Sequence, residues 1–212
     1  ATDEVTGIGN YDLSANNGVL VIPNGIVTIS QDAFSSNNDI KKVVIPDSVK
    51  LIKGGAFYSC KSLIDVDFVE EYGVSSGNFE SDEFFSRIVD DGRELVIEDS
   101  AFAYCSDLNH IKFPARIEEI NASAFEYCNL YSIDFGYDFK AEAGDNYALA
   151  RNNACYPGGY LTVGEKAFSN NANLKMVTLP EQFTIPDIYD TSSSSGGAAA
   201  GRDIRLWDPF GN

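Results

Sequence analysis

Side chains able to carry out catalysis are scarce in this sequence. His110 is the only histidine, and it falls between Leu108 and Ile111 in an alternating stretch. That pattern predicts a solvated strand residue rather than a general base. The motifs G-x-S-x-G, H-E-x-x-H and the phosphate-binding P-loop do not occur. We therefore expect a protein that is not an enzyme.

Carboxylates are plentiful, and counting them leaves an acid pair of the glycosidase kind open. Runs such as "EEY" at Glu70 and "DDG" at Asp90 are typical of solvated turns. The stretch "DFKAEAGDN" offers Glu142 and Asp145 as calcium ligands, but it lacks the alternating ligand pattern of an EF-hand loop. We expect no metal and no cofactor.

Cysteines occur at a shared position. Cys60, Cys105 and Cys128 each stand three residues after a phenylalanine, whereas Cys155 stands alone. Cys105 and Cys128 could come within disulfide distance if successive repeats stack. Side chains of one column point the same way, however, which favours parallel buried thiols. Closely spaced Cys or His pairs are absent, which argues against zinc.

The elements that position these residues follow from an internal repeat. Ala-Phe pairs recur at separations of 23, 45, 23 and 43 residues, so two steps look doubled. A period near 22 lies within the leucine-rich-repeat range of roughly 20 to 29. In the first doubled step Phe79, Phe85 and Ile88 match the register, which predicts a degenerate repeat. The second contains an insert or eroded repeat near 137–160. The expected phenylalanine column is Phe34, Phe57, Phe79, Phe102, Phe125 and Phe168.

Each repeat also carries an apolar-x-apolar pair after the phenylalanine, such as Val43/Ile45 and Ile111/Phe113. This is the period-2 signal of a short strand. Proline follows at Pro46 and Pro114, where it ends strand pairing. No repeat can bury its apolar side alone, so successive repeats must stack and form columns through the core.

The stretch "IPDSVKLIKGGAFYSCKSLIDVDF" resembles the BspA-like leucine-rich repeat family. The resemblance implies a curved, right-handed solenoid, β-rich with short parallel strands and little helix, which is secreted or surface-displayed in bacteria and binds proteins or mediates adhesion. We expect one domain over 1–212, with an N-terminal cap at 1–18 and about six to seven repeats over 19–180. A C-terminal loop and cap, including Ile204, Leu206 and Trp207, would occupy 181–212.

The charge balance limits the partners. Lys and Arg number 15 against 32 Asp and Glu, a net charge of -17, which repels nucleic acid and anionic membranes. No apolar run reaches the length of a membrane span. The polar start "ATDEV" suggests a mature or trimmed chain, from which any signal or anchor has been removed. The resemblance to the BspA-like family implies an extracellular or cell-surface location.

A binding face is predicted from strand alternation, because residues between the core positions must point to the concave side. The insert, with Tyr147 and Tyr156, is the alternative site. A polysaccharide-binding or polysaccharide-acting solenoid and a structural spacer are the alternative functions. The predicted face consists of Lys42, Val44, Asp65, Asp67, Arg87, Val89, His110, Lys112, Ser132, Asp134, Met176 and Thr178.

Overall fold

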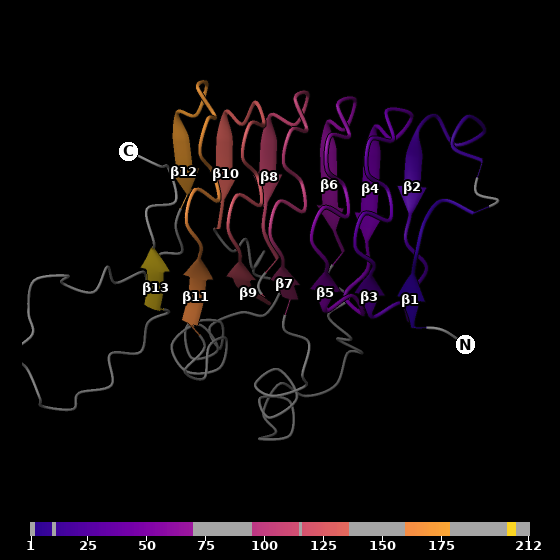
Figure 1. Ribbon diagram of the computed structural model, residues 1–212, viewed down its shortest axis with the longest axis horizontal. Coiled ribbons are helices and arrows are strands. Elements are labelled where there is room, and N and C mark those ends of the chain that lie inside the picture. The colour runs from indigo at the N-terminus through magenta and orange to yellow at the C-terminus, as the bar shows by residue number, and fades with distance from the viewer. Residues whose placement is uncertain are drawn as a thin grey trace, which may run out of the picture.

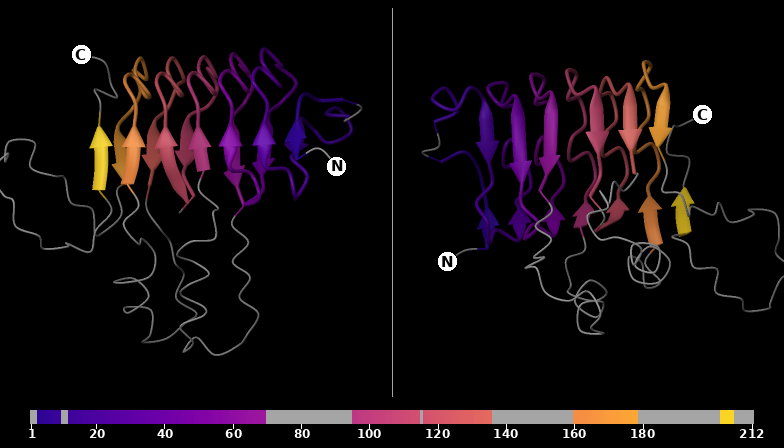
Figure 2. Two further views of the ribbon diagram at one scale, coloured as in Figure 1. Left: turned by 60° about the horizontal axis from the view of Figure 1, so that its bottom comes forward. Right: turned by 180° about the vertical axis from the view of Figure 1, so that it is seen from behind.

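The computed structural model describes residues 3–9, 12–69, 95–114, 116–135, 160–178 and 203–206. Over these ranges the chain is a parallel β-solenoid without helix, in which each turn of the coil, here called a rung, contributes strands to two sides (Figure 1). The predicted repeat solenoid with short parallel strands is confirmed. The two sides lie as two rows of strands along the long axis, and Figure 2 shows the same rows from behind.

One side is a single parallel sheet of seven strands. Neighbours are hydrogen-bonded throughout, with a register shift between Leu95 and Val96. In order, the strands are β1 (Glu4–Val5), β3 (Thr28–Ile29), β5 (Leu51–Ile52), β7 (Leu95–Ile97), β9 (Ile117–Ile120), β11 (Tyr160–Val163) and β13 (Asp203–Leu206).

The other side is divided into two three-stranded parallel sheets. No ladder joins β6 to β8, and we call this junction the seam. The first sheet contains β2 (Val19–Val21), β4 (Lys42–Ile45) and β6 (Asp65–Phe68); the second contains β8 (His110–Lys112), β10 (Ser132–Asp134) and β12 (Met176–Thr178).

Phenylalanine rings fill the core at one end of the rungs. Five of them stack in sequence, with centroid separations of 5.1 Å for Phe34–Phe57, 4.9 Å for Phe57–Phe102, 5.1 Å for Phe102–Phe125 and 5.5 Å for Phe125–Phe168. Each ring is at most 3% exposed. The stack therefore binds each rung to its neighbours through apolar contact.

The turn that holds each phenylalanine has an unusual backbone. Positive φ values occur two residues before and two residues after each of the five stacked rings, for example at Ser100 and Tyr104 around Phe102. These left-handed residues reverse the chain twice within a few residues. The Phe102 N–H then donates to the Ala124 carbonyl of the next rung at 2.8 Å. The preceding alanine, fully buried at Ala101, leaves no room for a larger side chain.

The degenerate repeat predicted within the first doubled step is wrong. Phe57 stacks directly on Phe102, and β5 pairs directly with β7, so no further rung lies between them. The residues that matched the register, Phe79, Phe85 and Ile88, lie outside the described residues, as do Arg87 and Val89 of the predicted binding face. The second doubled step also joins directly, because β9 pairs with β11.

Cysteine and asparagine occupy one hydrogen-bonding position beside the stack. Cys60 Sγ donates to the Phe34 carbonyl at 3.1 Å, and Cys128 Sγ donates to the Phe102 carbonyl at the same distance. Asn171 fills this position in a later rung, where its Nδ2 donates to the Phe125 carbonyl at 2.9 Å. Cys60, Cys105 and Cys128 are free and buried, as parallel thiols require. Cys155 lies outside the described residues.

Candidate binding surface

The side chains that alternate with the core positions on the divided side form two rows in register. Lys42 lies opposite Asp65, and Val44 opposite Asp67. Beyond the seam one row continues as His110, Ser132 and Met176, and the other as Lys112, Asp134 and Thr178. The structure thus brings the described members of the predicted face together on β4, β6, β8, β10 and β12. We call this surface the row face.

An ion-pair cluster lies on the β6 side of the seam. Lys42 Nζ is 2.8 Å from Asp65 Oδ2 and 3.0 Å from Asp67 Oδ2. Parallel pairing places the three side chains together, because Asp65 and Asp67 are alternate residues of one strand and Lys42 lies on the neighbouring strand. Hydrogen bonds to Asp65 and then Asp67 raise the pKa of the Lys42 ammonium. One cation therefore engages both carboxylates.

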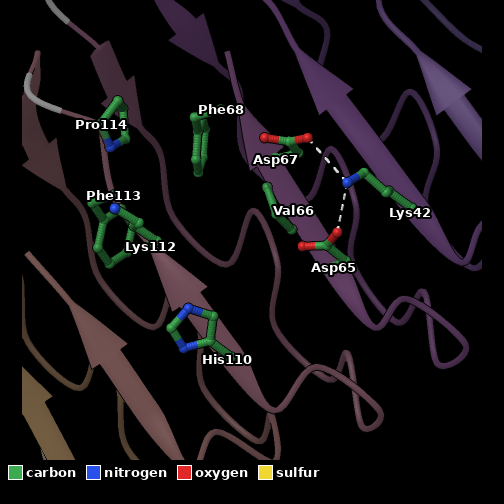
Figure 3. A pocket seen from close by; sticks show the side chains of 9 residues that line it. All are labelled: Lys42, Asp65, Val66, Asp67, Phe68, His110, Lys112, Phe113 and Pro114. Atoms are coloured by element: carbon green, nitrogen blue, oxygen red, sulfur yellow. Dashed lines mark ion pairs between the residues drawn. The ribbon is translucent and has the colours of Figure 1, made fainter. Parts of the chain in front are cut away.

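A pocket of about 270 Å³ opens at the seam (Figure 3). Asp65 and Asp67 line one wall, while His110 and Lys112 line the other. Among the described residues no ion pair crosses the pocket. The full lining is Lys42, Asp65, Val66, Asp67, Phe68, His110, Lys112, Phe113 and Pro114.

His110 is held at the pocket by its neighbour on β10. Its Nδ1 lies 2.6 Å from Ser132 Oγ, and Ser132 is only 7% exposed. This contact does not form a complete catalytic pair, because acyl transfer also needs an orienting group and donors for an oxyanion. The Ser132 N–H is already donated to the Asn109 carbonyl. In this arrangement the Ser132 hydroxyl orients the imidazole of His110.

Three exposed tyrosines form a second surface feature, which the sequence prediction missed. Tyr104 and Tyr127 stack at 4.8 Å with an interplanar angle of 13°, and Tyr58 is tilted against Tyr104 at 5.3 Å. Partial desolvation by its neighbours, and then the proximity of Tyr58 and Tyr127, raise the pKa of Tyr104. The only sequence signal is a tyrosine within each Phe-to-Cys turn, in "AFYSC", "AFAYC" and "AFEYC". We call this set the tyrosine ladder.

Other predicted sites lie outside the described residues: Glu142 and Asp145 as calcium ligands, Tyr147 and Tyr156 in the insert, and Trp207 in the cap. In the part of the chain that the structure describes, His, Cys, Asp and Glu do not cluster as a metal site would require. Within the same part, no helix has the length and apolar character to cross a membrane.

A family model described as "BspA type Leucine rich repeat region" matches the chain in overlapping segments at residues 7–89, 28–156 and 74–189, in six copies. A search of curated proteins gave no match.

Two solved structures share the fold. A leucine rich cell surface protein from Faecalibacterium prausnitzii A2-165 is 26% identical with a TM-score of 0.52, covering 76% of this chain and 32% of its own. A leucine-rich repeat protein from Bacteroides ovatus is 22% identical with a TM-score of 0.50, covering 78% of this chain and 34% of its own. The match thus spans about a third of the length of each of these two proteins.

Proposed function

Because the chain belongs to the BspA-type leucine-rich repeat family, we propose that it is a secreted or cell-surface protein that binds other proteins, in adhesion to host or neighbouring-cell surface molecules. The row face is its docking surface. The observation that carries this proposal is the alignment of charged, polar and apolar side chains in two rows across hydrogen-bonded strands, with a pocket between them. The surface location is supported by the cell-surface protein of Faecalibacterium prausnitzii, to which the chain is similar.

Rigidity supports a docking role for this face. The core positions behind it, Val43, Ile111 and Ile133, are at most 1% exposed, and parallel ladders hold the strands within each sheet. A partner that binds here meets side chains whose backbone is already ordered, so little conformational entropy is lost on binding. Both charge signs are present, with Lys42, Asp65 and Lys112 among them, which favours selective recognition of a partner.

The tyrosine ladder is the observation that would favour a glycan ligand instead. Sugars commonly stack on the open faces of aromatic rings, as bases do on stacking platforms. Tyr104 and Tyr127 instead stack on each other at 13°, so the two ring faces that meet are covered. The ladder therefore gives less support to a glycan platform than the row face gives to a protein interface.

Site-specific photo-crosslinking tests the proposal. A photoreactive residue replaces Met176, which is 51% exposed on the row face, and in separate proteins replaces Glu119 on β9 or Tyr104 in the tyrosine ladder. Each protein is irradiated with surface proteins from neighbouring cells or host tissue. We expect one discrete crosslinked partner from the Met176 position and none from the Glu119 position. Crosslinks from the Tyr104 position alone would move the interface to the tyrosine ladder.

The recovered partner then permits an affinity test. Replacement of both His110 and Lys112 by Ala should weaken its binding, whereas a Gly-Ser replacement of 137–159 should leave the affinity unchanged. The opposite result would place the binding site on the insert.

A further inference from the structure

We propose that the seam pocket binds the carboxylate of an aspartate or glutamate side chain from a protein partner, held by Lys112 and His110. This inference rests on the proposed function, because it names the chemical group that the row face recognises. It concerns a single side-chain subsite within that face.

Lys112 is exposed at the seam and forms no ion pair with another described residue, although Asp134 lies opposite it on β10. In a continuous parallel sheet, neighbouring strands lie roughly 4.8 Å apart, and Asp67 would be placed to pair with Lys112. The seam removes that pairing, because no ladder joins β6 to β8. Asp67 pairs with Lys42 instead, at 3.0 Å. In the described chain, Lys112 forms no ion pair, which leaves its ammonium available to an anion from outside.

The imidazole of His110 provides a second polar group on the same wall. It lies two residues from Lys112 on one strand, so both side chains project to the same side (Figure 3). Its contact with Ser132 Oγ at 2.6 Å holds the ring in one orientation. A carboxylate between the two groups gains a charge-assisted hydrogen bond from Lys112 and a polar contact from His110.

The rest of the pocket suits the short apolar stem of an acidic side chain. Phe68 and Phe113 lie with ring centroids 6.4 Å apart, and Pro114 adjoins them in the lining. A volume of about 270 Å³ is sufficient for one side chain. Methylene groups would lie against these rings while the carboxylate reaches the β8 wall. The recognised group is therefore an anion on an apolar stem.

The overall charge selects the kind of partner that presents this group. A net charge of -17 attracts a basic protein at long range and repels an acidic one. The cluster of Asp65 and Asp67 with Lys42, which carries a formal excess of one negative charge, lies across the pocket. A basic partner surface is attracted by the net negative charge of this chain, and one acidic side chain within that surface can bind Lys112 and His110 in the pocket.

Nuclear magnetic resonance on the full chain tests this inference directly, because the single histidine gives one imidazole signal. The probe is N-acetylglutamate N-methylamide, and the matched control is the corresponding glutamine derivative. We expect a saturable shift of the His110 ring signal with the glutamate probe and none with the glutamine control. Lys112→Gln should weaken the probe's Kd on the order of tenfold, the loss of one charge-assisted hydrogen bond.

Three controls make the outcomes decisive. Lys112→Arg keeps the charge and should retain affinity within about threefold, which separates a lost contact from a damaged fold. Lys50→Gln removes the same charge from an exposed residue outside the pocket and should leave binding unchanged. Circular dichroism confirms that each variant is folded.

The inference is overturned if Lys112→Gln binds the probe as well as the unaltered chain does, or if the glutamine control binds equally. Tighter binding of glucuronate than of the glutamate probe would overturn the protein source in favour of a glycan. If the glutamate probe does not bind but the protein still crosslinks to its partner through position 176, this subsite is disproved and the proposed function stands. Loss of the Met176 crosslink would instead remove the proposed function.

Discussion

The rings of Phe57 and Phe102 stack with centroids 4.9 Å apart and an interplanar angle of 8°, although the whole segment 70–94 separates them in the chain. Their backbones are joined too, because the Phe57 N–H donates to the Ala101 carbonyl at 2.7 Å. The rungs on either side of that segment are therefore direct neighbours, and the solenoid continues through this point without it.

Replacement of 70–94 by a short turn copied from the connection between β4 and β5 should therefore preserve the fold. We expect unchanged strand content by circular dichroism and a free energy of unfolding within about 1 kcal/mol of the original, because β5 and β7 already pair directly and the entropy of loop closure depends only weakly on loop length. An insoluble or unfolded product would show that the segment supports the core.

Truncation of a central ring should be costly. Phe102→Ala or Phe125→Ala should lower the free energy of unfolding by about 3 to 5 kcal/mol, because each ring is fully buried and contacts rings on both sides. Phe34→Ala should cost less, since the described stack ends there. Urea titrations measure the three values, and equal losses would contradict a column whose ends are less constrained.

Arg116, which directly precedes β9, should stabilise the turn between β4 and β5. Its Nη1 donates to the Val49 carbonyl at 2.5 Å and its Nη2 to the Pro46 carbonyl at 3.2 Å. Arg116→Met should cost about 1 to 3 kcal/mol, because the carbonyl of the fully buried Val49 loses this donor. Arg116→Lys keeps one donor group, so its melting temperature should lie between those of the unaltered chain and Arg116→Met. An unchanged free energy of unfolding in Arg116→Met would show that water replaces the hydrogen bonds to the two carbonyls.

The core thiols should react slowly while the chain is folded. Burial raises the pKa of the Cys60 thiol to about 11, although a backbone hydrogen bond with Asn37 opposes the shift. A hydrogen bond with Cys128, and then burial, raises the pKa of Cys105. At pH 8 about 0.1% of a thiol with a pKa near 11 is ionised. Mass spectrometry after alkylation should find Cys60, Cys105 and Cys128 modified only after denaturation.

The same shift sets an alkaline limit on stability. The folded pKa of Cys60 lies above its ordinary value of 9.0, so folding favours the protonated thiol. The contribution of the protonated Cys60 thiol to the free energy of unfolding is complete below pH 9 and is lost as the pH rises through about 11. Cys60→Ala should therefore show a smaller fall in melting temperature between these pH values than the unaltered chain does.

Local spacing in the sequence was enough to predict the class of fold. The recurrence of Ala-Phe and of apolar-x-apolar pairs predicts stacked rungs, because a rung that cannot bury its own apolar side must repeat it in register. The same alternation predicted which side chains share the row face, since the period of a strand is two. Lys42, His110 and Lys112 were found this way.

Only the tertiary structure decided which repeats are neighbours. Phe79 matches the repeat pattern, yet membership in the stack depends on pairing between distant strands, and β5 pairs with β7. The seam has the same origin, because the failure of β6 and β8 to form a ladder is a long-range property. The tyrosine ladder depends on left-handed turns that place Tyr104 and Tyr127 in contact. Sequence spacing specifies what each rung contains, whereas the hydrogen bonds between rungs determine which side chains meet.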